Sequence, residues 1–163
     1  MSAMLDFDNA CEQQGIPQQS TFLSWVEDTL RHAATATEKP YSIGLRIVDE
    51  TESAQLNEHY RQQDKPTNVL SFGADLPAAV LDALDEIPLG DLAICAAVVL
   101  REAQEQEKDP TAHWAHMTVH GVLHLLGHDH EDASQAEQME ALERAILASW
   151  GIADPYLSEQ SQP

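Results

Sequence analysis

The chain has 163 residues, of which 43% are hydrophobic, and its formal net charge at pH 7 is −20. This length fits one domain, and the hydrophobic share is enough for a core. The longest apolar run, residues 92–100, is far shorter than the roughly 20 residues that a membrane-spanning helix needs, so we expect no membrane association. Proteins that bind nucleic acid broadly carry a basic face, so any phosphate-bearing partner of this acidic chain must meet a local cationic patch.

The two cysteines, Cys11 and Cys95, are too few for a disulfide scaffold and form no Cys-x-x-Cys pair. Both lie among apolar residues, where cysteine is commonly a small buried hydrophobe. The first residues carry neither the basic flank nor the long apolar stretch of a secretory signal. We therefore expect a cytoplasmic protein in a reducing compartment.

The first half of the chain alternates between strand and helix patterns. A helix is expected to start at a cap on Ser20 or Thr21 and to end at Pro40. Residues 41–48 alternate like a half-buried strand, with four side chains on one face: Tyr41, Ile43, Leu45 and Ile47. Together the patterns predict strands at 4–11, 41–48 and 69–72, and helices at 21–37 and 51–61.

The second half is richer in helix. Residues 73–88 hold two prolines and many small residues, and they predict a loop with about one helical turn. Beyond them we expect a strand at 89–95 and helices at 96–108, 111–126 and 132–149. The acidic segments are expected to be solvated helix faces, at 82–86, 102–109 and 131–143.

These elements predict an α+β fold in a single domain over residues 1–156. We expect a small mixed sheet of about four strands packed against four or five helices. No internal repeat or interdomain linker interrupts the chain. The polar residues 157–163 are expected to form a flexible tail.

Six of the eight histidines lie between positions 113 and 130. His120 and His124 are four residues apart, so on a helix both imidazoles face the same way and can bind one zinc ion. A straight helix cannot supply a third ligand from a new direction. Gly127 permits a turn at the helix end, after which His130 can return toward the pair. We therefore expect one Zn²⁺ per chain.

The spacing matches the metzincin pattern H-E-x-x-H-x-x-G-x-x-H in its three histidines and its glycine, which predicts a metzincin-like zinc site. Gly121 replaces the catalytic Glu of that pattern, which speaks against a peptidase. Three histidine ligands leave a fourth position for water, as in catalytic sites, whereas structural zinc sites are usually closed by four protein ligands. The sequence therefore predicts a metal-dependent hydrolase domain.

Other polar residues near the three histidines fit the role of metal ligand less well. The helical rise from His116 to the second histidine of the pair is about 12 Å, too long for both to bind one ion. We expect His116 to support the site from outside or to pack the helix, and His113 to lie at the surface or at a helix cap. His128 competes with His130 as third ligand, and we favour His130. Asp129 is expected to accept a hydrogen bond from a ligand imidazole.

Six segments stand out in chain order: LNEHYR (56–61), DKPTNVLSF (64–72), LGD (89–91), WAHM (114–117), HGVLHLLGHDH (120–130) and DPY (154–156). Together they resemble the YbeY family of single-strand-specific endoribonucleases, and the resemblance runs through most of the chain. One departure is His128, where the family often has Tyr.

The resemblance implies a zinc-dependent RNase that matures ribosomal RNA, especially the 3′ end of the small-subunit RNA, and serves ribosome quality control. It implies zinc ligands at His120, His124 and His130 and a functionally important Arg61. We accordingly expect His124 and Arg61 to take part in catalysis. The partners it implies are single-stranded RNA, ribosomal RNA and the small ribosomal subunit. Because the acidic surface would repel free RNA, we also expect help from a ribosome-associated protein or from the ribosomal particle.

Two other functions stay open. One is a zinc hydrolase that acts on another bond, and the other is a non-enzymatic ribosome-assembly factor whose zinc only stabilises the fold. For RNA binding, we expect a small basic cleft, because three of the eight cationic residues fall close together in sequence: Arg46, Arg61 and Lys65.

Overall fold

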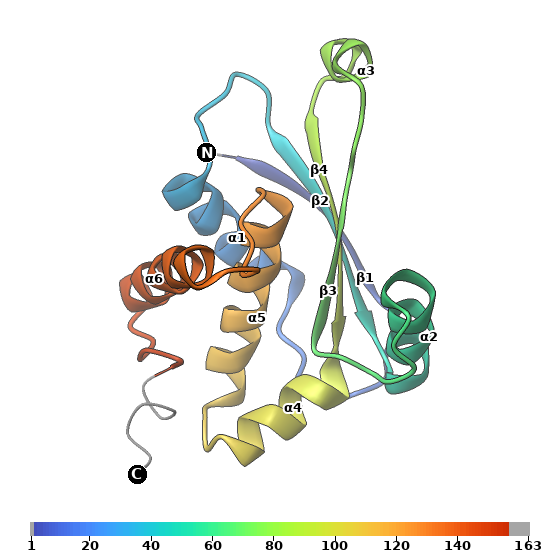
Figure 1. Cartoon of the computed structure of the whole chain (residues 1–163), viewed down its shortest axis with the longest axis vertical. Coiled ribbons are helices and arrows are strands. Elements are labelled where there is room, and N and C mark those ends of the chain that lie inside the picture. The colour runs from blue at the N-terminus through green and yellow to red at the C-terminus, as the bar shows by residue number, and fades with distance from the viewer. Residues whose placement is uncertain (1, 157–163) are drawn as a thin grey trace.

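The computed structural model describes residues 2–156, so the tail expected at 157–163 lies outside the described residues. Within these residues, four strands alternate with the first four helices, and two more helices follow (Figure 1). The strands are β1 (Ala3–Asn9), β2 (Tyr41–Val48), β3 (Val69–Gly73) and β4 (Ile87–Cys95). The helices are α1 (Gln19–Ala33), α2 (Glu50–Arg61), α3 (Ala78–Ala83), α4 (Ala96–Glu105), α5 (Pro110–Leu125) and α6 (Ala133–Ser149).

The strands form one mixed sheet in the order β1-β2-β4-β3. Strand β2 pairs in parallel with both β1 and β4, while β3 pairs antiparallel with β4 and forms an edge. The alternation predicted for residues 41–48 is confirmed, because every second side chain of β2 is buried. The α+β class and the mixed four-stranded sheet are therefore as the sequence predicts.

Helices cover the two faces of the sheet unequally. Helices α1, α5 and α6 lie on one side, and α2 lies on the other (Figure 1). The main core forms under α1 and α5, where the rings of Phe22 and Trp114 meet edge to face at 5.7 Å. A smaller cluster of buried side chains lies on the opposite face, where Leu70 and Ala93 pack with Leu56 of α2. Helix α5 therefore packs against β3 and β4 and also contacts α1 and α6.

Helix α5 approaches the sheet closely because Gly121 has no side chain. A Cβ at this position would lie 2.8 Å from Leu92 Cδ2 and 3.3 Å from Val69 Cγ2. The N-cap of α5 is Asp109, whose carboxylate accepts a hydrogen bond from the amide of Thr111 at 2.8 Å, and Pro110 begins the helix. The start of α5 and its seat on the sheet thus position the histidines at its other end.

Some boundaries differ from the sequence predictions. The loop expected at 73–88 contains the short helical segment predicted for it, since α3 has six residues and lies at the tip of the β3–β4 connection (Figure 1). Counting α3, residues 2–156 hold six helices, where four or five were expected. The predicted cap on Ser20 or Thr21 is wrong, since Gln18 is the N-cap and makes no side-chain capping bond. Helix α1 also ends at Ala33, well before Pro40. Its last fully buried residue is Leu30, so a longer helix would bury no further apolar face.

Cys95 is buried, as expected, but Cys11 is only half-buried, and both are free thiols. Among residues 2–156, no helix combines the length and the apolar character needed to cross a membrane.

Candidate metal centre

The end of α5 turns sharply at Gly127, as the sequence predicts. Gly127 has φ +98°, a conformation that residues with a Cβ rarely adopt. Its amide donates to the carbonyl of His124 and the amide of His128 donates to the carbonyl of Leu123, both at 3.0 Å. This pair of bonds is a Schellman motif, which satisfies the last carbonyls of the helix and reverses the chain. The reversal brings the segment that carries His130 back toward α5.

Three imidazoles meet at this helix end. Nε2 of His120 lies 3.1 Å from Nε2 of His124. The centroid of the His130 ring lies 5.1 Å from the centroid of the His124 ring and 5.8 Å from that of the His120 ring. One ring nitrogen from each of the three lies within 4.8 Å of the others, an arrangement that could hold a metal ion. His120 and His124 are half-buried and His130 is exposed, so the group opens to solvent on one side.

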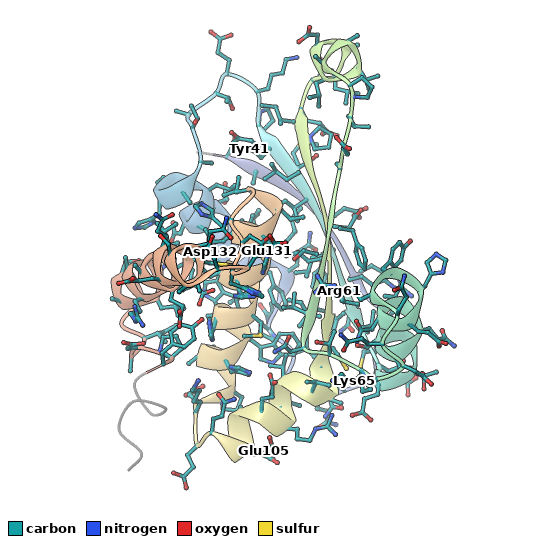
Figure 2. The ribbon with its side chains drawn as sticks, in the orientation of Figure 1. Tyr41, Arg61, Lys65, Glu105, Glu131 and Asp132 are labelled. Carbon is teal, nitrogen blue, oxygen red and sulfur yellow. The ribbon has the colours of Figure 1, made fainter. Side chains whose placement is uncertain are left out.

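The local field favours neutral imidazole at His124. Burial, and then the neighbouring His120 and His130, lower its pKa from 6.5 to about 4, and the guanidinium of Arg61 adds to this effect. A neutral imidazole has a free nitrogen lone pair, which is the form that binds a metal. Arg61 therefore contributes to the electrostatic environment of His124. Arg61 is the last residue of α2, and its side chain is labelled in Figure 2.

A buried carboxylate lies behind this group. The side chain of Glu143, on α6, has no exposed surface, and its Oε1 accepts a hydrogen bond from Nδ1 of His120 at 2.6 Å. Its Oε2 accepts from Nε2 of His116 at 2.9 Å and from the hydroxyl of Tyr156. These three side chains converge on one carboxylate from α5 and from the segment that follows α6.

These contacts set the ionisation of the carboxylate. Burial opposes the charged form of Glu143, but the hydrogen bonds from His116 and His120 outweigh burial and lower its pKa to about 2. Tyr156 responds in the opposite direction, because burial and the adjacent Glu143 charge raise its pKa. At neutral pH Glu143 is therefore a carboxylate surrounded by donors. His116, His120 and Glu143 form a second group of three that could hold a metal, and it shares His120 with the first group.

The structure corrects several predictions around the site. Glu143 falls in the acidic segment 131–143 that was expected to be solvated, yet it is fully buried. Its position could have been inferred, because it continues the apolar stripe of α6 at helical spacing between Met139 and Ile146. Asp129 was expected to accept from a ligand imidazole, but it accepts from the backbone amide of His130 at 2.7 Å. Glu143 instead accepts a hydrogen bond from the imidazole of His120. Nothing in the sequence pattern around Tyr156 indicates its contact with Glu143.

The other histidines of α5 also have clear places. His116 is buried and bonds to Glu143 within the second group that could hold a metal, so the supporting role expected for it stays a prediction. The prediction that His113 lies at the surface or a cap is wrong, since it is 3% exposed and its Nε2 lies 2.9 Å from Glu102 Oε1. His128 belongs to neither three-residue group within residues 2–156.

Two of the cationic residues expected in a basic cleft, Arg46 and Arg61, differ in their charge partners. Arg46 bonds to Glu52 through Nε at 2.6 Å and also pairs with Asp8, so its charge is compensated by two carboxylates. The expectation that Arg46 contributes to a basic cleft is therefore wrong. Arg61 forms no ion pair within residues 2–156, which leaves its guanidinium available for an anion.

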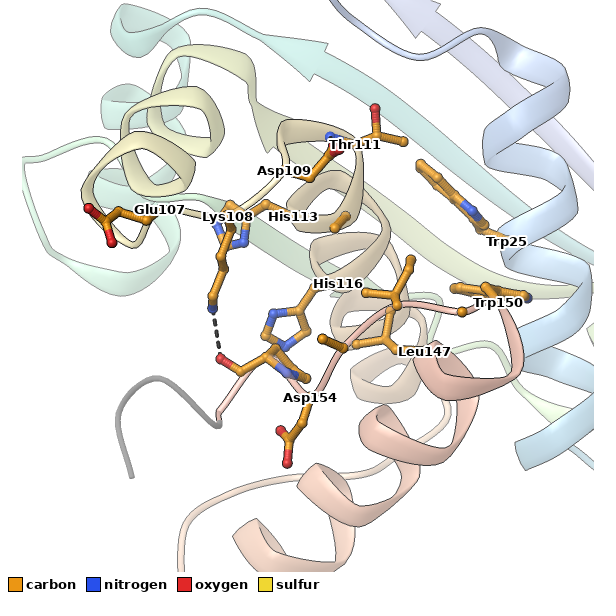
Figure 3. A pocket seen from close by; sticks show the side chains of 15 residues that line it. Trp25, Glu107, Lys108, Asp109, Thr111, His113, His116, Leu147, Trp150 and Asp154 are labelled. Atoms are coloured by element: carbon orange, nitrogen blue, oxygen red, sulfur yellow. Dashed lines mark hydrogen bonds between the residues drawn. The ribbon is translucent and has the colours of Figure 1, made fainter. Parts of the chain in front are cut away.

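Two cavities flank α5. One of about 190 Å³ touches His120 and is also lined by Asn68, Glu102, His116 and Tyr156. A larger one of about 590 Å³ lies near the start of α5, where Trp25, Leu147 and Trp150 form an apolar wall beside His116 (Figure 3). None of the three clustered imidazoles lines the larger cavity, so the candidate metal centre and this cavity are separate.

The fold and the site together define a small α+β domain with a histidine-rich candidate metal centre at a helix end. Residues 6–151 match the family model described as "Endoribonuclease YbeY", and the chain belongs to this family.

Relatives with that name include proteins from Alkalilimnicola ehrlichii, 54% identical over 90% of this chain and 86% of the relative, and from Pseudomonas fluorescens, 49% identical over 97% and 100%. A third, from Stenotrophomonas maltophilia, is 50% identical over 93% of this chain and 91% of its own. The fold is also similar to a solution structure of a Thermotoga maritima protein, with a TM-score of 0.54 and 23% identity over 98% of both chains.

Proposed function

We propose that this protein is a zinc-dependent endoribonuclease that cleaves single-stranded RNA, with His120, His124 and His130 as the ligands of one zinc ion. The observation that carries the proposal is the convergence of these three imidazoles at the solvent-facing end of α5. The name endoribonuclease, which the relatives share, supports RNA as the substrate.

Donor distances favour this group over the group that includes Glu143. Ligands about 2.0–2.1 Å from a tetrahedral zinc ion lie about 3.3 Å from one another. The 3.1 Å separation of the Nε2 atoms of His120 and His124 is close to that value. His120 Nδ1 and Glu143 Oε1 are only 2.6 Å apart, which is a hydrogen-bond distance and too short for two ligands of one ion. We therefore place the metal on the His130 side of His120.

A zinc ion at this site would act as a Lewis acid toward a phosphodiester and would lower the pKa of water. Arg61 is the residue best suited to hold the scissile phosphate, because guanidinium binds phosphate through two parallel hydrogen bonds. Its lack of an ion pair within residues 2–156 and its electrostatic effect on His124 support this role. His124 would contribute through the metal that it binds.

We further propose that the substrate is ribosomal RNA, at the 3′ end of the small-subunit RNA, and that the protein serves ribosome quality control in the cytoplasm. The net charge of −20 repels free RNA over most of the surface, so a single uncompensated arginine gives little affinity by itself. Binding to the small ribosomal subunit, or to a protein associated with it, would present the RNA to the site.

The test uses purified full-length protein, metal analysis and labelled RNA oligonucleotides. We expect about one zinc per chain, cleavage of single-stranded but not duplex RNA, loss of cleavage on chelation with the fold retained, and recovery on addition of zinc. His124→Ala should fold, bind zinc poorly and fail to cleave. A chelated protein that cleaves as fast as the zinc-loaded one would refute the metal-dependent mechanism. Normal support of ribosome assembly by a folded His124→Ala protein would favour the non-enzymatic alternative.

A further inference from the structure

The hydrogen bonds around Glu143 determine which nitrogen of His120 carries a proton. A carboxylate has no hydrogen to donate, so the 2.6 Å contact requires a hydrogen on Nδ1 of His120. A neutral imidazole has only one N–H, so Nε2 of the same ring keeps a free lone pair. That atom faces Nε2 of His124 at 3.1 Å, on the side where the metal ion is proposed.

We propose that Glu143 is a positioning residue of the metal centre, which holds His120 in the Nδ1–H tautomer and fixes the direction of its Nε2 lone pair. The inference rests on the proposed zinc centre at His120, His124 and His130. Carboxylates that accept from the second nitrogen of a ligand histidine fix its orientation and raise its basicity, and their loss typically weakens metal binding by about 10- to 100-fold.

Two more donors fix the carboxylate itself. His116 and the hydroxyl of Tyr156 both donate to Oε2, on the side away from His120. With one oxygen held in this way, the other is directed at Nδ1 of His120. His116 therefore takes part in the site without binding the metal, which agrees with its distance along α5 from the second metal ligand.

The segment after α6 delivers Tyr156 to this position. Oδ1 of Asp154 accepts from the amide of Tyr156 at 2.8 Å, and Oδ2 accepts from Nε of Arg144 at 3.1 Å. The guanidinium of Arg144 also lies 5.4 Å from the centre of the Tyr156 ring. Arg144 follows Glu143 in the sequence, so α6 holds both the carboxylate and the segment that supplies its third donor.

A matched pair of carboxylates makes the inference testable. Glu102 also accepts from a buried histidine of α5, since its Oε1 lies 2.9 Å from Nε2 of His113, but neither residue belongs to a group that could hold a metal among residues 2–156. Glu143→Gln should weaken zinc binding by about 10- to 100-fold in a chelator competition assay. Glu102→Gln should change it by less than about twofold, because it removes a similar ion-dipole contact away from the ligands.

The second measurement uses metal-free, ¹⁵N-labelled protein, whose ring nitrogen shifts report the tautomer of each histidine. We expect His120 to be the Nδ1–H tautomer in the wild type and a mixture of tautomers in Glu143→Gln. Tyr156→Phe should retain the tautomer but weaken zinc binding severalfold. Tyr41→Phe, which removes a buried hydroxyl bonded to the carbonyl of Thr35, should leave zinc binding unchanged.

The outcomes separate this inference from the proposed function. A wild-type protein that binds no zinc at the three histidines would refute the proposed centre. Tight zinc binding by the wild type and equally tight binding by folded Glu143→Gln would refute only the role of Glu143. If Glu143→Gln does not fold, a wild-type His120 in the Nε2–H form would by itself overturn the inference. Loss of the Nδ1 hydrogen when zinc is added would do the same, because it would place the metal on the Glu143 side.

Discussion

At the scale of single residues, Glu143 illustrates which contacts a sequence pattern predicts and which it does not. The three clustered histidines could be predicted because they lie in one segment, where helical spacing and one glycine determine their directions. Glu143 belongs to another helix, and its contacts with His116 and His120 arise only when α6 packs on α5. A charged residue within an apolar stripe was the one available signal, but its partner could not be read from the stripe.

Arg61 and Arg46 give a prediction at this scale, because they differ in their neighbours. Arg61→Ala should lower kcat/KM for single-stranded RNA by about 100-fold or more, as loss of a group that stabilises transition-state charge usually does. Zinc affinity should not fall, since Arg61 is not a ligand and its charge disfavours a cation. Steady-state cleavage assays and chelator competition would measure the two effects.

Arg46→Ala is the matched control. It breaks ion pairs with Asp8 and Glu52 whose side chains are partly exposed, so stability should change by less than about 1 kcal/mol. RNA cleavage should stay close to that of the wild type. Equal losses of activity in both variants would contradict the assignment of the phosphate contact to Arg61.

At the scale of elements, long periodic patterns predict the presence of helices and strands well, but they predict the ends of these elements less well. The strand over Tyr41–Val48 and the helices around 51–61 and 132–149 agree closely with β2, α2 and α6. The end of α1 was misplaced because Pro40 only sets an outer limit, while the actual end depends on where the core stops. The turn after α5 was predicted correctly, since a glycine at a helix C-terminus carries a conformational signal of its own.

Gly127→Ala tests how much the zinc site depends on this turn. A Cβ in the left-handed region costs about 1–2 kcal/mol, and relaxation of the turn would move His130 away from the pair. If zinc binding must restore the strained turn, affinity should fall by about tenfold, since 1.4 kcal/mol corresponds to a factor of ten. Chelator competition on the folded variant measures the change.

Gly15→Ala provides the comparison, because Gly15 also has a positive φ, of +82°, and nothing lies within 4 Å of an added Cβ. It should lower the melting temperature to a similar degree and leave zinc affinity unchanged. A similar loss of zinc affinity in both variants would mean that general destabilisation, and not the turn, is responsible.

Gly121→Ala tests the close contact between α5 and the sheet. Alanine in a helix gains about 1 kcal/mol over glycine, but overpacking against Leu92, which is 1% exposed, costs about 1–3 kcal/mol. We therefore expect a net loss of stability in chemical denaturation. In a Leu92→Val background the same substitution should cost less stability, because valine lacks the δ-methyl groups that the added Cβ meets. Purely additive effects of the two substitutions would show that the contact does not control the position of α5.

At the scale of the whole molecule, the order of the elements determines the fold class, whereas the excess of acidic residues determines the electrostatic character of the surface. The chain has 28 acidic and 8 basic residues, so like charges repel over most of the surface at neutral pH. Composition alone predicts this repulsion, but only the structure shows that Arg46 is compensated and that Arg61 forms no ion pair with the residues that the structure describes.

The stability of the metal-free protein should therefore rise with ionic strength. Between about 10 mM and 300 mM NaCl, screening shortens the range of repulsion from about 30 Å to below 10 Å, so the melting temperature should increase. Calorimetry in NaCl and KCl would measure it, and similar effects of both salts would identify screening as the cause. A melting temperature that falls with salt would mean that attractive ion pairs, and not net repulsion, dominate.

All three proposed zinc ligands lie within residues 120–130, while the carboxylate behind them comes from α6. An unfolded chain keeps such a short stretch of histidines together and can still capture zinc, although without the ordered rings and without Glu143. Because a ligand stabilises a fold only by its preference for the native over the denatured chain, zinc should protect this protein from unfolding less than its affinity for the native state suggests.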